Sequence, residues 1–258
     1  MESIVVLVLF LTGILAGGYG TIVGAGGGFI FVPMLLLVLN VSPTIASGSG
    51  LVIVLINAFS GTIGYAKQKK IDYRTGILIA IGAFPGSLLG VWLLHVYDSN
   101  YFYLVFAVVL ILLGVFLFIK NISSSKTDRK SFSVNKNKKN NIEKKWLLPL
   151  GLLMGTLSSY LGIGGGWLLV PILIYVFKFS THLATATSIF SLFIYSSYGV
   201  IVQILYNSID WVIVFWGAIG IIIGSQIGVK LAKNLSGKFI MQLLSILLII
   251  IGIRMCFE

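Results

Sequence analysis

Long apolar stretches separated by short polar ones organise this chain. Residues 3–66, 75–97 and 183–209 contain no Asp, Glu, Lys or Arg. A helix of about 20 apolar residues crosses the hydrocarbon core of a bilayer, so each stretch is long enough for at least one crossing. The pattern therefore predicts a protein built from apolar membrane helices.

Glycine, proline and polar positions divide these stretches into ten apolar segments. They cover residues 4–23, 28–40, 44–66, 75–97 and 101–119 in the first half, and 146–161, 166–178, 183–206, 211–233 and 239–257 in the second. Segments 28–40 and 166–178 hold about 13 residues, or about 20 Å of helix against a core of about 30 Å. Each either crosses together with its neighbour or forms a re-entrant hairpin with it, so we expect eight to ten membrane segments.

The second half repeats the first at an offset of 138 positions. The sequence GAGGGFIFVP at 24–33 returns as GIGGGWLLVP at 162–171, and KIDY at 70–73 falls on SIDW at 208–211. The match runs without a gap from about residue 13 to about residue 118. An internal repeat of this kind determines the architecture. We expect a first transmembrane repeat at 1–119, a linker at 120–145 and a second repeat at 146–258.

Composition agrees with a membrane protein, because 58% of the residues are apolar and only 10% are charged, against about 25% charged in soluble domains. The net charge of +11 does not indicate nucleic-acid binding, because the basic residues lie between apolar segments. Nine of them fall in the linker, which is also rich in Ser and Asn and is expected to be a solvated loop. The first segment is preceded by Glu2 and by no basic residue, so we expect it to stay in the mature protein rather than act as a signal peptide.

The basic residues also predict the orientation of the two halves. Cytoplasmic loops are enriched in Lys and Arg, which places loop 67–74 and the linker inside the cell. The loop equivalent to 67–74, at 205–212, has no Lys or Arg, and basic residues return one loop later, at Lys230 and Lys233. Of all the basic residues, only Arg254 falls outside this scheme. We therefore expect an all-α polytopic protein of two inverted-topology repeats, with five apolar segments each and both chain ends outside, in the bacterial cytoplasmic membrane.

Inverted repeats are a recurrent design of secondary transporters, and short or interrupted segments in matching positions point to the binding site. The two decapeptides are such interruptions. Three glycines in a row weaken a helix, and the new helix that begins at Phe29 has a free, partly positive N-terminus that suits an anion. Close helix packing is the alternative for these glycines, and we favour it for the GxxxG-type pairs such as Gly13 and Gly17. Neither decapeptide has the spacing of a dinucleotide-binding fingerprint or of a P-loop.

Polar residues inside the apolar segments complete the candidate site. The hydroxyls cluster at ASGSG (46–50) and ATATS (184–188); each could instead bond to its own helix. Three amide side chains, those of Asn57, Gln203 and Gln226, also lie at membrane depth. For each of them, substrate contact and a contact between helices are equally open. The predicted substrate-binding residues are Gly26, Gly27, Gly28, Ser47, Ser49, Asn57, Gly164, Gly165, Gly166, Thr185, Thr187, Ser188 and Gln226.

Charged groups contribute little to this site. Asp72 and Asp210 match across the repeat but sit at segment edges, where we favour helix-start roles over proton handling. The sequence contains no metal-ligand cluster, no nucleophile paired with a base, and one cysteine, Cys256. We therefore expect no catalytic residue, no metal and no cofactor.

The decapeptides with their Ala-Ser/Thr runs, GAGGGFIFVP…PTIASGSG and GIGGGWLLVP…THLATATS, resemble the TauE/SafE-type sulfite exporter family of bacterial membrane permeases. The resemblance covers the chain apart from the linker. It implies transport of small sulfur-containing anions, such as sulfite or organosulfonates, across the cytoplasmic membrane. The GSG at 48–50 departs from the Ala-Thr run of the second half, so the two faces of the site need not be equivalent.

The leading hypothesis is a secondary transporter for a small anion, sulfite or an organosulfonate, working by alternating access. An uncoupled, channel-like permease is the first alternative, and a membrane enzyme or assembly factor is a distant second. The expected partners are the anion, the lipid bilayer and, as an open option, further copies of the chain.

Overall fold

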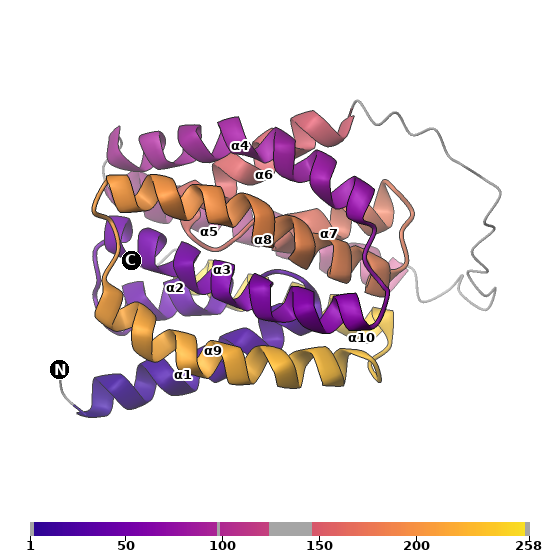
Figure 1. Ribbon diagram of the computed structural model, residues 1–258, viewed down its shortest axis with the longest axis horizontal. Helices are drawn as coiled ribbons and strands as arrows, with labels where there is room; N and C mark the ends of the chain where they lie inside the picture. The colour runs from indigo at the N-terminus through magenta and orange to yellow at the C-terminus, as the bar shows by residue number, and fades with distance from the viewer. Residues whose placement is uncertain (1–2, 97–98, 124–145, 256–258) are drawn as a thin grey trace.

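The computed structural model describes residues 3–96, 99–123 and 146–255, and these residues form ten α-helices without a strand (Figure 1). The helices are α1 (Ser3–Val23), α2 (Gly28–Leu37), α3 (Pro43–Lys67), α4 (Tyr73–Val96), α5 (Ser99–Ser123), α6 (Leu147–Leu161), α7 (Gly166–Tyr175), α8 (Thr181–Leu205), α9 (Trp211–Ala232) and α10 (Gly237–Met255). They coincide with the ten expected segments, so the helical prediction is confirmed. Most of the expected linker lies outside the described residues.

The helices have the length and surface of membrane helices. Over the residues that the structure describes, six of them, α1, α3, α4, α8, α9 and α10, are long and apolar enough to cross a bilayer. The exposed side chains of α4 and α9 are mainly large and apolar, for example Trp92, Ile222 and Ile223. Such a surface is compatible with lipid rather than with water, and the chain is a multi-pass membrane protein.

Two matched aspartates start two matched helices. The Asp210 carboxylate accepts hydrogen bonds from the backbone N–H groups of Val212 (2.9 Å) and Ile213 (3.2 Å) at the start of α9. The Asp72 carboxylate accepts from the N–H (3.1 Å) and the hydroxyl (2.9 Å) of Thr75 in the first turn of α4. Both are N-cap arrangements, so the helix-start interpretation of these residues is confirmed.

Helices from opposite halves pack in matched pairs, α1 against α9 and α6 against α4 (Figure 1). A methyl group added to Gly13 would meet the Gly217 carbonyl, and one added to Gly151 would meet the Ile79 carbonyl. These two contacts are related by the 138-residue offset. Small residues that let helix backbones touch are typical of membrane interfaces, and the packing role favoured for the GxxxG-type glycines is confirmed.

Equivalent helices also pack directly against each other, α3 against α8 and α5 against α10. In the first pair, Gly199 faces Leu51 and Gly61 faces Ile189, so the residue number rises along one helix as it falls along the other. The second pair behaves in the same way, with Gly114 against Ile249 and Gly252 against Ile111. Each equivalent pair is therefore antiparallel, and α3 and α8 form the middle of the molecule.

Candidate functional site

The interruptions after α1 and after α6 meet at the centre of the protein. A methyl group added to Gly28 would lie 2.7 Å from the Ile163 Cα, and one added to Gly166 would lie 2.9 Å from the Ala25 Cα. The two breaks, residues 24–27 and 162–165, are thus in backbone contact. The triple glycines, placed 138 residues apart in the sequence, are brought together by the fold.

Two side chains from the middle helices flank this meeting point. Val54 on α3 and Leu192 on α8 are equivalent in the repeat, and both are fully buried. Each contacts both Gly26 and Gly164, at 3.0–3.3 Å from the position of an added methyl group. The space between the two breaks is therefore filled by apolar side chains, and an anion could enter only if Val54 and Leu192 moved apart.

The breaks begin two residues earlier than the triple glycines suggest. The left-handed backbone positions are Gly24 (φ +82°), Gly26 (+74°), Gly162 (+69°) and Gly164 (+77°). Gly28 already belongs to α2, one residue ahead of the expected start at Phe29, and Gly166 belongs to α7. Only glycine adopts these φ values without strain, so Gly24 and Gly162 are further determinants of the breaks that the focus on three consecutive glycines missed.

Each break is tied to a middle helix by one polar side chain. With its amide oriented so that the oxygen accepts from the Gly27 N–H (2.9 Å), Asn57 also donates to the Thr21 hydroxyl (2.9 Å) and to the Gly17 carbonyl (3.3 Å). In the other half, the Tyr195 hydroxyl accepts from the Gly165 N–H (3.0 Å). Tyr195 is the repeat equivalent of Asn57. Sequence reasoning missed it because a tyrosine in an apolar run is unremarkable, although the offset of 138 would have found it.

The first two N–H groups of the helix that follows each break have no acceptor. The Gly27 carbonyl accepts from Ile30 and Phe31, and the Gly165 carbonyl accepts from Leu168 and Leu169. Among the described residues, no acceptor bonds to the backbone N–H groups of Gly28, Phe29, Gly166 and Trp167. All four residues are buried. Free N–H groups and the helix dipole make a helix N-terminus attractive to an anion.

Two buried side-chain donors accompany these N–H groups. The Thr185 hydroxyl and the Trp167 indole N–H have no hydrogen-bond partner, and both residues are at most 1% exposed. The Thr185 Cα lies 2.8 Å from the position of a methyl group on Gly24, so Thr185 packs onto the first break. Trp167 stands in the first turn of α7. Buried polar groups are normally paired, so the unpaired Thr185 hydroxyl is available as a donor to a ligand.

The remaining predicted hydroxyls are paired within the protein. Ser47, the equivalent of Thr185, donates to the Tyr160 carbonyl (2.9 Å), and Ser188 donates to the Gly24 carbonyl (2.8 Å). Ser49 and Thr187 accept from the backbone N–H groups of Asp210 and Asp72, both at 3.0 Å. Ser47 and Ser188 therefore adjoin the breaks, while Ser49 and Thr187 connect the middle helices to the two aspartate loops.

The two glutamines lie apart from the breaks. Gln226 is exposed on α9 and donates to the Ser60 hydroxyl (2.7 Å) and carbonyl (3.0 Å) on α3. Gln203 is buried on α8 and donates to the Ser159 carbonyl (3.2 Å). Both connect helices, and the structure does not bring Gln226 to the centre.

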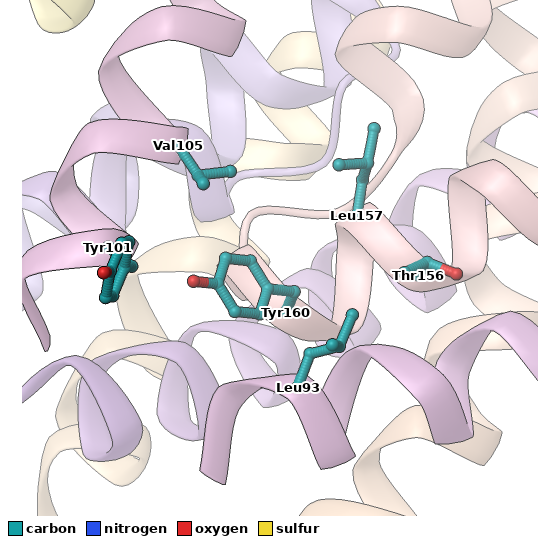
Figure 2. A pocket seen from close by; sticks show the side chains of 6 residues that line it. All are labelled: Leu93, Tyr101, Val105, Thr156, Leu157 and Tyr160. Atoms are coloured by element: carbon teal, nitrogen blue, oxygen red, sulfur yellow. The ribbon is translucent and has the colours of Figure 1, made fainter. Parts of the chain in front are cut away.

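A separate apolar pocket of about 260 Å³ lies between α4, α5 and α6 (Figure 2). Its lining consists of Leu93, Tyr101, Val105, Thr156, Leu157 and Tyr160. The Thr156 hydroxyl is turned to its own helix, where it donates to the Leu152 carbonyl (2.9 Å). With apolar walls and no break residue in its lining, this pocket does not extend the polar groups at the centre.

Charged side chains and metal-ligand groups do not contribute to the centre. Within the described ranges, no three His, Cys, Asp or Glu residues come close enough to hold a metal ion. None of the charged side chains in these ranges belongs to the buried set. The candidate site is thus made of backbone N–H groups and the Thr185 hydroxyl.

Comparison with known proteins places the chain in a family. The family model described as sulfite exporter TauE/SafE matches residues 9–255. The chain belongs to the TauE/SafE sulfite exporter family. The family resemblance drawn from the decapeptides is therefore confirmed, and the protein is a membrane transporter of the TauE/SafE type.

Relatives in this family come from distant organisms. The chain is 29% identical to the probable membrane transporter protein YunE of Bacillus subtilis, with 98% of this chain and 97% of that protein covered. It is also 29% identical to a probable membrane transporter protein of Methanocaldococcus jannaschii (96% and 94% covered) and 27% identical to one of Xylella fastidiosa (84% and 81% covered). No solved structure gives a significant match.

Proposed function

We propose that this TauE/SafE-family protein is a secondary transporter that moves a small anion, sulfite or an organosulfonate, across the bacterial cytoplasmic membrane. The observation that carries the proposal is the set of four buried N–H groups without acceptors, at Gly28, Phe29, Gly166 and Trp167. Two helix N-termini, each in contact with the opposite break, and the buried Thr185 packed on the first break offer neutral donors to a small oxyanion. The family description adds the sulfur chemistry.

Inverted-topology repeats at 1–119 and 146–258, joined by a cytoplasmic linker at 120–145, would give this site its two accesses. The antiparallel packing of α3 with α8 and of α5 with α10 supports the inversion. A two-fold operation that reverses equivalent helices also exchanges the two sides of the membrane. The two halves then provide two similar packings, one open to each side, as in other inverted-repeat transporters.

The helices α1 and α2 are best explained as a re-entrant hairpin. Gly26 faces Val54 in the middle of α3, whereas Gly50 near the start of α3 faces Val32 in α2. The helix α2 therefore returns along α3 toward the side on which α3 begins. By the repeat, α6 and α7 form the corresponding hairpin from the opposite side. Broken backbone at membrane depth is tolerated where it is buried in protein, as both breaks are.

The structure would represent a closed state of such a transporter. Val54 and Leu192 fill the space between the breaks. On one side, Ser208 packs against Gly48 and Asp210 bonds to Ser49. On the other side, Asp72 bonds to Thr187. Alternate release of these two contacts would open the centre to one side at a time.

Flux measurements in proteoliposomes test the transport proposal. We expect saturable uptake of radiolabelled sulfite that depends on an imposed gradient and falls in Thr185→Val. Thr156→Val is the matched control, because its hydroxyl bonds to its own helix, and it should transport like the wild type. Saturable flux without any dependence on a coupling gradient would favour the channel-like permease. Equal flux in Thr185→Val and wild type would contradict the site.

Cysteine labelling tests the inversion. Lys69 and Asn207 are repeat equivalents, and both are exposed in loops with positive φ. With Cys256 replaced by Ser, a cysteine at 69 should react only from the cytoplasm and a cysteine at 207 only from outside. Labelling of both from the same side would contradict inverted repeats and leave the anion site untouched.

A further inference from the structure

We infer that the central site takes its anion in a singly charged form, so that hydrogen sulfite or a monosulfonate is carried while the sulfite dianion and sulfate are rejected. The inference rests on the proposed function and deepens it by naming the charge state of the substrate. It follows from the type of donor that the two breaks present.

All donors at the centre are neutral. They are the four free N–H groups and the hydroxyl of Thr185, a buried residue that packs on the first break. In the described ranges, the side chains that carry or can gain charge lie in loops or in the terminal turns of helices: Lys67, Lys69, Lys70, Asp72, Arg74, His95, Lys178, His182, Asp210, Lys230, Lys233, Lys238 and Arg254. Two titratable groups bond to the breaks or their flanks, the hydroxyls of Tyr195 and Tyr65.

Physical scaling then separates single from double charge. The free energy needed to remove an ion from water rises with the square of its charge, so a dianion requires about four times as much as a monoanion of equal size. Attraction to fixed neutral dipoles rises only in proportion to charge, so it about doubles. Without a buried cation, donors that suffice for one charge are insufficient for two.

An unpaired acceptor beside the donors favours a protonated anion. In the first break, the Gly24 carbonyl accepts a hydrogen bond from Ser188. The repeat equivalent of Ser188 is Gly50, which has no hydroxyl. A methyl group added to Gly50 would lie 2.8 Å from the Gly162 carbonyl oxygen. No described residue donates to the Gly162 carbonyl. This oxygen also lies 2.8 Å from the methyl position on Gly28, next to a free N–H. A hydrogen sulfite ion could donate its O–H there, whereas a dianion would be repelled.

Transport of anions of defined charge by the wild-type protein tests the inference. Purified protein in liposomes would be supplied with sulfite, methanesulfonate or sulfate, below and above the pH at which hydrogen sulfite loses its proton. Protein-free liposomes correct for sulfur dioxide that crosses the lipid. Methanesulfonate is a monoanion throughout, so its pH profile reports any effect of pH on the protein itself.

We expect sulfite flux, divided by methanesulfonate flux, to fall about tenfold for each pH unit above that ionisation, following the hydrogen sulfite fraction. Sulfate should neither cross nor compete. A flat ratio, or sulfate flux equal to that of methanesulfonate, would overturn the inference while leaving the proposed transport intact. Absence of protein-dependent flux for all three anions would overturn the proposed function, and the inference with it.

Discussion

The two breaks have one backbone and two different sets of partners. Residues 24–27 and 162–165 turn through left-handed glycines at the same two positions. The first is held by Asn57, which makes three hydrogen bonds, and the second by Tyr195, whose hydroxyl accepts from the Gly165 N–H. Ser188 donates a hydrogen bond to the Gly24 carbonyl of the first break, whereas its equivalent Gly50 has no hydroxyl to donate to the Gly162 carbonyl of the second. The comparison teaches that the repeat preserves the turn while allowing the two faces to bind differently.

The largest expected effect comes from disturbing the contact between the breaks. In Gly166→Ala the new methyl would lie 2.9 Å from the Ala25 Cα and meet the Gly24 carbonyl. We expect loss of flux and about 2 kcal/mol lower stability, as for other overpacked sites, measured by uptake and by thermal unfolding in detergent. Gly18→Ala is the control, because its methyl meets its nearest atom, the Gly224 carbonyl, at 3.4 Å. Comparable loss in both variants would contradict a special role for the contact.

Removing the two holding side chains should have unequal effects. Asn57→Leu leaves the Gly27 N–H and the Thr21 hydroxyl without their partner, and we expect a loss of about 3 kcal/mol in stability. Tyr195→Phe removes one hydrogen bond and keeps the ring, for a loss of about 1 kcal/mol. Urea or thermal unfolding of both variants measures the difference. Equal losses would mean that the two breaks are held equally.

Thr185 and Ser47 allow stability and transport to be separated. Thr185→Val removes a hydroxyl that has no partner, so stability should change by less than about 0.5 kcal/mol while sulfite flux falls severalfold. Ser47→Ala removes a donor to the Tyr160 carbonyl, so stability should fall by about 1 kcal/mol with flux per folded protein unchanged. The opposite pattern would exchange the roles assigned to the two residues.

The smallest effect is expected at Gln226. Its side chain is exposed and bonded to Ser60, so Gln226→Leu should lower stability by about 1 kcal/mol or less and leave the KM for sulfite unchanged. Leu88 holds the equivalent position in the first half, which shows that an apolar residue fits there. A raised KM would place Gln226 on the substrate path after all.

Much of the helical layout was accessible from the sequence because it depends on local chemistry. Apolar length predicted all ten helices, and the matched aspartates predicted two helix starts. Paired small residues such as Gly13 and Gly151 predicted close packing. The identity of the packing partner could not be predicted, because a glycine indicates how closely a helix is approached and not by which helix.

The candidate site was predictable only in part for the same reason. The glycine pattern located the breaks to within two residues, and Asn57 was found by its polarity. Tyr195 was missed, and Gln226 was placed with the central residues although it lies on the surface. The Thr185 hydroxyl has no hydrogen-bond partner, whereas its equivalent Ser47 has one. This difference depends on neighbouring backbone atoms that no local sequence pattern specifies.

By itself, the sequence determined that this protein lies in a membrane, and it determined the ten helices, the internal repeat and the two glycine breaks. These features follow from hydropathy, spacing and the backbone freedom of glycine. Only the tertiary structure decided that the breaks touch each other, that Val54 and Leu192 close them, and that four N–H groups there remain unpaired. These properties arise because helices of one half pack against helices of the other, which brings together residues more than a hundred positions apart.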